Sequence, residues 1–327
     1  MSIQDLTPRL TRAVFCVLYC SLSMPQVLSA QCDYSKTEPA TADGICNNDP
    51  WVLVFEDNFD GDALNLENWE IQSHSQGAFL TSASQEYNTL ENVRVSDGYL
   101  HIDIKEEEVV RKAVNWRPEA DTLSDGMLNL RSYNYTSSNL WTRKKFAYGK
   151  YEIRCKIPRG KGYWPAFWTF GGDNGWNEID VFEFWDYYGP TGTFKLDKSV
   201  QRHRTNTHYD YDKTGGHHNC PRHKYITDFS QGIHTFELIW TPYSIEWIVD
   251  GVSVRKKYKF SKVMGLKKID CNNYSEGKKY KVDKAFPTQE MNIIVNVAVR
   301  RNGVTPNSTG TSFPGVMVVD YIRFSAR

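Results

Sequence analysis

The chain has 327 residues, of which 24% are charged and 14% are aromatic. Lysine plus arginine and aspartate plus glutamate each number 39, so the balanced charge gives no reason to expect nucleic acid or a membrane surface as a partner. The length suits one large all-β domain, and the aromatic content is typical of strands and suits the flat faces of sugars.

Residues 1–30 are predicted to be a secretory signal peptide. Arg9 and Arg12 precede a short apolar run at 13–24, which is too short to span a bilayer as a helix. Small residues at 28–30 suit cleavage before Gln31. We therefore expect a secreted protein, extracellular or periplasmic according to its host.

The remainder of the chain divides into a polar segment and one domain. Residues 31–50 are rich in Asp, Asn, Thr and Pro, whereas strand patterns dominate residues 51–327. No internal repeat, linker or further span of membrane length interrupts this domain. We therefore expect a monomer that acts without a membrane or nucleic-acid partner.

Short strand patterns with turns between them predict an all-β sandwich or barrel. The turns are Ser96-Asp97-Gly98, Thr241-Pro242 and Asp250-Gly251. The strand patterns lie at 51–59, 91–107, 148–158, 234–258, 291–299 and 316–325.

Two segments, 186–206 and 212–228, are predicted to be loops on either side of a short strand. A lysine-rich stretch follows at 255–284. We favour a solvated surface for these residues, while a local basic surface for an anionic substrate is the functional alternative. The loops carry His203, Arg204, His217, His218, Arg222 and His223.

The densest chemical pattern is WNEIDVFEFW at 176–185, which places three carboxylates in an apolar strand. Glu178 and Asp180 share a face because alternate residues of a strand point the same way. Glu183, five residues after Glu178, would face the other side of a regular strand. A β-bulge at Val181-Phe182 would bring it back.

Three carboxylates on one face repel one another, and crowding raises at least one pKa. Glycoside cleavage with retention uses one ionised and one protonated carboxyl group about 5–5.5 Å apart. The pattern therefore predicts Glu178, Asp180 and Glu183 as catalytic residues, with a calcium-binding or exposed acidic strand as the alternative. Upstream, Trp164 and Trp168 share a strand face and are candidates for stacking on sugars, the alternative being core packing.

The motif Glu-Ile-Asp-Val-Phe-Glu at 178–183 resembles the bulged catalytic signature of glycoside hydrolase family 16, the laminarinase, agarase and κ-carrageenase group. The lichenase and xyloglucan branches resemble it but lack the extra residue. The similarity covers most of 51–327 in several separated segments. It implies a β-jelly-roll sandwich, similar to concanavalin A, with a concave substrate cleft.

The resemblance also implies roles for single residues. Glu178 would be the nucleophile, Asp180 its helper and Glu183 the acid/base. His208 matches a histidine near the substrate. No cofactor is implied for the chemistry. Asp320 matches one ligand of a structural calcium ion, but Asn58 stands where an acidic ligand is usual.

Three functions follow from these patterns. The first is endo-hydrolysis of a β-1,3-glucan or mixed-linkage β-glucan. The second is hydrolysis of a β-galactan, either neutral or sulfated. Arg300 and Arg301 stand where laminarinase-like members usually have two glycines, and guanidinium groups pair well with sulfate. The third is a lectin-like carbohydrate-binding module, whose mark would be a degraded catalytic triad.

Overall fold

The structure of the chain is a computed structural model. It describes residues 38–39, 49–71, 78–79, 83–114, 130–171, 176–185, 199–210, 217–263, 267–301, 305–307 and 310–327. The predicted signal peptide and most of the polar segment at 31–50 lie outside the described residues, so both stay predictions. In the described part of the chain, no helix has the length and apolar character needed to cross a bilayer.

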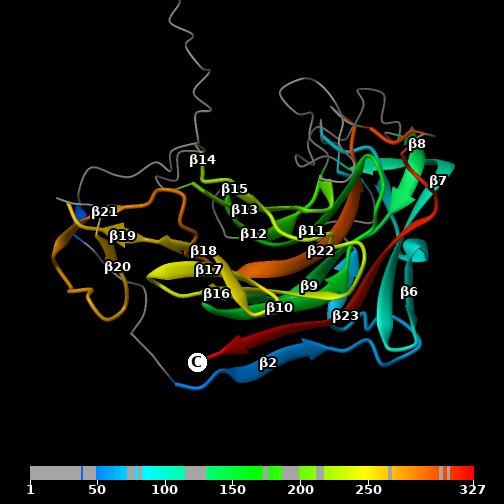
Figure 1. Cartoon of the computed structure of the whole chain (residues 1–327). Helices are drawn as coiled ribbons and strands as arrows, with labels where there is room; N and C mark the ends of the chain where they lie inside the picture. The colour runs from blue at the N-terminus through cyan, green and yellow to red at the C-terminus, as the bar shows by residue number, and fades with distance from the viewer. Residues whose placement is uncertain are drawn as a thin grey trace, which may run out of the picture. The chain divides into compact units, whose positions relative to one another are not determined.

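The larger sheet has the strand order β18-β17-β16-β10-β23-β7-β8-β5, with β2 on β23 and β4 and β6 on β7. β2 lies antiparallel beside β23, so the two ends of the domain are neighbours (Figure 1). The strands are β2 (Val52–Asp57), β4 (Ala78–Phe79), β5 (Tyr87–Asn88), β6 (Val93–Ser96), β7 (Tyr99–Val114), β8 (Leu130–Ser137), β10 (Gly149–Lys156), β16 (His234–Trp240), β17 (Ser244–Val249), β18 (Val252–Tyr258) and β23 (Gly315–Ala326).

The second sheet has the order β14-β13-β12-β11-β22-β9-β3, with β15 also on β13. Its central strands carry the residues that the sequence singles out for chemistry. The strands are β3 (Trp69–Ile71), β9 (Asn139–Phe146), β11 (Tyr163–Gly171), β12 (Asn177–Glu183), β13 (Arg202–Tyr209), β14 (His218–Asn219), β15 (Arg222–Tyr225) and β22 (Met291–Val299).

A small third sheet has the order β1-β21-β19-β20 and its own apolar cluster, which includes Phe260 and Tyr280. Its strands are β1 (Glu38–Pro39), β19 (Phe260–Ser261), β20 (Lys268–Ile269) and β21 (Lys279–Val282), and a short 3-10 helix, η1 (Leu90–Asn92), precedes β6.

The main core lies between the two large sheets. Alternation along β16 and β17 buries Phe236, Leu238 and Trp240, and then Ile245 and Trp247. They meet the buried residues of the second sheet in one continuous apolar cluster. The all-β sandwich predicted from the sequence is therefore confirmed.

The predicted turns at Asp97-Gly98 and Asp250-Gly251 are also confirmed. All four residues have positive φ, between 47° and 76°, as two-residue hairpin turns with the right twist require. Prediction of loops at 186–206 and 212–228 was partly wrong. Arg202–Tyr209 form β13, which lies between β12 and the short outer strands β14 and β15. The exposed polar side chains of β15 are normal at a sheet edge. Residues 186–198 and 212–216 of these two segments lie outside the described residues.

Candidate active site

β12 carries the three carboxylates and contains the predicted bulge. Ala166 and Phe167 of β11 face Glu183 and Phe182, but the next residue, Trp168, faces Asp180. Val181 is therefore the extra residue, and the pairing of β12 with β13 shifts at the same place. The prediction of a bulge at Val181-Phe182 is confirmed.

The bulge sorts the side chains of β12 between two faces. Ile179, Val181, Phe182 and Phe184 all enter the core between the sheets. The three carboxylates share the opposite face, which we call the carboxylate face. Two consecutive apolar side chains can point inward because one residue is added to the alternation.

Two carbonyl groups at the bulge are satisfied by side chains. Trp247 Nε1, from β17 of the other sheet, donates to the carbonyl oxygen of Asp180 at 2.8 Å. His203 Nε2 donates to the carbonyl oxygen of Val181 at 3.0 Å. Since a buried carbonyl without a partner destabilises a fold, these two donors hold the bulge in place.

His208 joins the acidic pair from the neighbouring strand. It lies directly opposite Glu178 in the register, and its Nε2 is 3.5 Å from Glu178 Oε1 and 3.6 Å from Asp180 Oδ2. The predicted substrate residue is therefore beside the catalytic candidates.

Asn206 fixes the orientation of that histidine. Its Oδ1 accepts the backbone N–H groups of Thr207 at 2.9 Å and Cys220 at 3.1 Å. The amide nitrogen must then face His208, where it donates to Nε2 at 2.7 Å. Neutral His208 consequently carries its proton on Nδ1.

Burial and mutual repulsion keep protons in the acidic cluster. Burial, followed by the charges of Asp180 and Glu183 and a hydrogen bond with Asp180, raises the pKa of Glu178 well above its ordinary value. Burial and the charge of Asp180 raise the pKa of Glu183 to about 7. Arg204, His208 and the Trp164 hydrogen bond oppose the shift of Glu183.

Glu183 lies against an aromatic and basic group of side chains. Trp164 Nε1 donates to Glu183 Oε1 at 3.0 Å. The Arg204 guanidinium carbon is 3.5 Å from the centre of the Trp185 ring, and that of Arg300 is 4.5 Å from it. Burial lowers the pKa of Arg204 to about 10, which still leaves it charged at neutral pH.

A row of rings extends from the other end of the carboxylate face. Trp168, half buried, contacts Trp141 and Phe170, and its Nε1 donates to Asn296 Oδ1 at 2.8 Å. Phe170 in turn contacts Trp176, which is 43% exposed. Trp164 and Trp168 thus share a face as predicted, but they lie in separate ring groups, one beside Glu183 and one in this row.

Sequence reasoning missed Asn206, Trp185 and Trp141 at this site. A usable signal existed for the first two. Asn206 precedes His208 by two residues and so shares its strand face, and Trp185 ends the acidic motif. Trp141 had no signal, because β9 reaches the face only through its pairing with β22.

Two groups of residues are candidates for holding a metal ion. The donor atoms of Glu178, Asp180 and His208 lie within 4.8 Å of one another, a spacing that a cation can bridge. The calcium ion predicted at Asp320 is untested, but its residues fit poorly. Arg154 forms an ion pair with Asp320, and Arg323 donates to Asn58 Oδ1 at 3.2 Å, so guanidinium groups occupy both positions.

Comparisons with known proteins agree with this geometry. The family model described as glycosyl hydrolases family 16 matches residues 109–322. A β-glucanase of Rhodothermus marinus is 28% identical over 84% of this chain and 84% of its own length. A glucan endo-1,3-β-glucosidase of Niallia circulans is 27% identical over 83% of this chain, a match that spans 37% of that longer protein.

Solved structures show the same architecture. The laminarinase catalytic domain of Thermotoga maritima is 27% identical, with a TM-score of 0.58 over 85% of this chain and 99% of that domain. The likeness confirms the predicted jelly-roll sandwich.

Proposed function

Because the chain belongs to glycosyl hydrolase family 16, we propose that it hydrolyses β-1,3-glucan or mixed-linkage β-glucan at internal linkages, with retention of anomeric configuration. The observation that carries the proposal is the bulge, which puts Glu178, Asp180 and Glu183 on one face. The relatives named above, a β-glucanase and an endo-1,3-β-glucosidase, support glucan as the substrate.

Glu178 attacks the anomeric carbon in this scheme. The Asp180 contact raises the pKa of Glu178, so the attacking form is Glu178 after it has lost its proton, with Asp180 beside it to orient the carboxylate. A glycosyl–enzyme ester forms at Glu178 as the bond to the leaving sugar breaks. Asp180 is therefore a positioning residue for the nucleophile.

Glu183 supplies the proton for the leaving oxygen. A pKa of about 7 keeps it protonated in mildly acidic solution. Its Oε1 already accepts the Trp164 N–H, which leaves Oε2 to carry the proton toward the substrate. Glu183 then removes a proton from the water that hydrolyses the ester.

The substrate lies along the carboxylate face. Trp168 and the exposed Trp176 offer ring surfaces on the Glu178 side, and Trp164 with Trp185 offers a second aromatic group beside Glu183. We propose that successive sugars contact these two groups on opposite sides of the cleaved bond.

A second substrate class is favoured by one observation. Arg204 and Arg300 both stack on Trp185 beside Glu183, and among the described residues Arg204 forms no salt bridge or hydrogen bond through its side chain. Two guanidinium groups suit a sulfate or carboxylate on a sugar. A sulfated β-galactan is therefore the alternative substrate.

A panel of polysaccharides tests these proposals. Release of reducing ends from laminarin, but not from agarose, porphyran or κ-carrageenan, is expected. Release only from a galactan would reject the glucan assignment. Activity unchanged in Glu178→Gln would reject the catalytic site, and a protein that binds glycans without cleaving any of them would be a lectin-like module.

We also propose that the protein is exported and acts as a monomer. The basic start and short apolar run before Gln31 support export. N-terminal sequencing of secreted protein should begin at Gln31, and retention of residues 1–30 would contradict this.

A further inference from the structure

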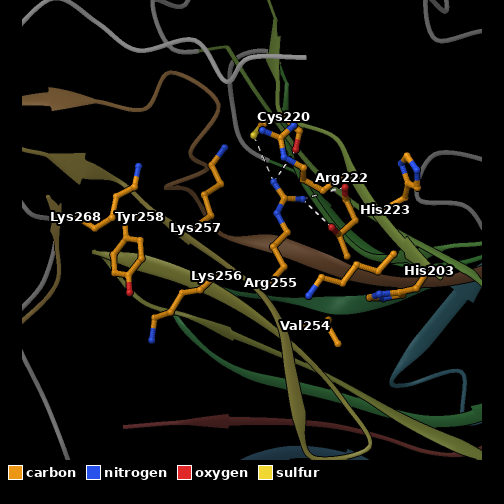
Figure 2. A pocket seen from close by; sticks show the side chains of 12 residues that line it. His203, Cys220, Arg222, His223, Val254, Arg255, Lys256, Lys257, Tyr258 and Lys268 are labelled. Atoms are coloured by element: carbon orange, nitrogen blue, oxygen red, sulfur yellow. Dashed lines mark hydrogen bonds between the residues drawn. The ribbon is translucent and has the colours of Figure 1, made fainter. Parts of the chain in front are cut away.

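A polar cavity with a volume of about 380 Å³ lies away from the carboxylates (Figure 2). Its walls come from β13 and β15 of one large sheet, from β18 of the other and from β20 of the small sheet. His203 and Thr205 of β13 line it, and these alternate along the strand with Arg204 and Asn206 of the carboxylate face. The cavity is therefore separate from the proposed catalytic site.

The lining is strongly basic. It includes six lysine or arginine residues and two histidines, but no aspartate or glutamate. The six are Arg222, Lys224, Arg255, Lys256, Lys257 and Lys268.

Arg255 and Lys257 form a fixed floor. The Arg255 guanidinium donates to Thr205 Oγ1 and to the carbonyl oxygen of Cys220, each at 2.7 Å (Figure 2). It also lies over the Trp247 ring. Lys257 is buried and pairs with Asp283 at 3.1 Å. Lys257 directs its three N–H donors to Asp283, Thr207 and Ala285, so the Arg255 guanidinium is the charge that the floor offers to a ligand. Arg255 is held in place before any ligand arrives, which reduces the entropy lost on binding.

Arg222 and Lys224 form an exposed rim on β15. Both side chains are exposed, and both belong to the lining of the cavity. Lys224 forms no ion pair with any residue that the structure describes. The rim thus adds charge that solvent and an anion can reach.

The titration of the surrounding groups is consistent with a positive field. The pKa of Lys257 is lowered to about 8, chiefly by burial, with the charges of Arg255 and Arg222 contributing and Asp283 opposing the shift. Burial lowers the pKa of His203 to about 4, with Arg255 and Lys224 contributing. A bound anion would relieve this repulsion.

We propose that this cavity binds a sulfate or phosphate group, either as the free ion or as an ester on a polysaccharide. A volume of about 380 Å³ is at the lower end of the range of small-ligand sites and admits one oxyanion with an attached sugar. Guanidinium and ammonium groups on three sides match the tetrahedral oxygens. The site would hold an anionic chain while the carboxylate face cleaves elsewhere.

Calorimetric titrations at low ionic strength test this proposal, with sodium sulfate, sodium phosphate, dextran sulfate and neutral dextran as probes. Saturable binding is expected for the anionic probes and not for dextran. Binding of the inorganic ions would identify the free ion as a ligand, whereas binding of dextran sulfate alone would identify the ester on a polysaccharide. Binding should weaken as salt rises.

Arg222→Ala/Lys224→Ala should weaken binding by about tenfold or more, because it removes two charge-assisted contacts. Lys105→Ala/Arg111→Ala on β7 removes the same two residue types outside the cavity and should leave binding within about twofold. Both variants should keep wild-type circular dichroism.

Three results would overturn the proposal. They are no saturable binding of any anion, equal weakening in both double variants, or loss in Arg300→Ala with none in Arg222→Ala/Lys224→Ala. The last result would move the anion to the carboxylate face. Glycan hydrolysis is measured separately, so failure here leaves the proposed function standing.

Discussion

Glu183 is buried beside Asp180, and these surroundings set the pH range in which it can act as an acid, with the Trp164 indole and the Arg204 guanidinium opposing the shift. Its pKa is raised to about 7, chiefly by burial. A group with a raised pKa holds its proton below that value and loses it as pH rises through it.

We therefore expect kcat/KM for the preferred polysaccharide to fall as pH rises above about 7. Glu183→Gln should lower turnover by about 100-fold or more, and the alkaline fall should disappear for an activated aryl glycoside that needs no proton. Rate measurements from pH 4 to 9 check this. If the fall in kcat/KM at alkaline pH persists in Glu183→Gln, the ionisation that causes it belongs to another group.

Asn206 acts on the carboxylates only through His208, according to its contacts. Asn206→Ala and His208→Ala should each lower kcat by about tenfold, and the double variant should be no worse than His208→Ala. Steady-state kinetics of the wild type, the two single variants and the double variant complete this double-mutant cycle. Losses that multiply would show that Asn206 has a separate role, and thermal unfolding controls for damage to the fold.

The bulge in β12 is needed because Glu183 is five positions after Glu178, an odd spacing that would put the two on opposite faces of a regular strand. Deleting Val181 should restore regular alternation with Glu178, Asp180 and Glu183 at even spacing, still on one face. Activity should survive within about tenfold, although loss of a buried valine lowers the free energy of unfolding by about 1–3 kcal/mol.

Deletion of Ile179 is the matched control, since it also removes a buried apolar residue from β12. It makes Glu178 and Asp180 adjacent, so they face opposite sides and activity should be lost. Equal activity in two folded deletion variants, measured by reducing-end release, would contradict this account of the bulge.

His203 connects the bulge to β13, and its pKa of about 4 predicts a change of stability with pH. The ordinary histidine pKa is 6.5, so the unfolded chain binds more protons between pH 6.5 and 4. The contribution of His203 to stability is full above pH 6.5 and declines as pH falls toward 4.

His203→Phe should lower the free energy of unfolding by about 1–3 kcal/mol at pH 7, since it leaves the Val181 carbonyl unpaired. That deficit should shrink as pH falls, because the wild type alone loses the histidine contribution. Urea unfolding at pH 7, 5.5 and 4 measures it. A deficit independent of pH would mean that His203 is not held neutral.

Sequence patterns predicted the elements with strong alternation and missed those at the edge. The spacing of Glu178, Asp180 and Glu183 was enough to predict the bulge. Arg202 to Asn206 were assigned to a loop because none of the five residues is apolar, so no alternation is visible, and only their pairing with β12 and β15 reveals the strand.

At the scale of the whole molecule, the site depends on contacts between residues distant in sequence. Trp247 reaches from one sheet to the Asp180 carbonyl on the other, and Arg204 and Arg300 meet on Trp185 although they are 96 positions apart in the sequence. Such contacts leave no local pattern. The sequence therefore predicted the carboxylates but not the aromatic and basic group around Glu183.

The central claim is that Glu178 forms a covalent bond to the sugar while Glu183 assists. Incubation with a 2-deoxy-2-fluoro glycoside of a laminari-oligosaccharide, followed by peptide mass spectrometry, tests it most directly, because the fluorine slows release of the glycosyl–enzyme ester. The label should appear on Glu178 alone. A label on Glu183, or no label together with an inverted product from the wild-type protein, would contradict the claim.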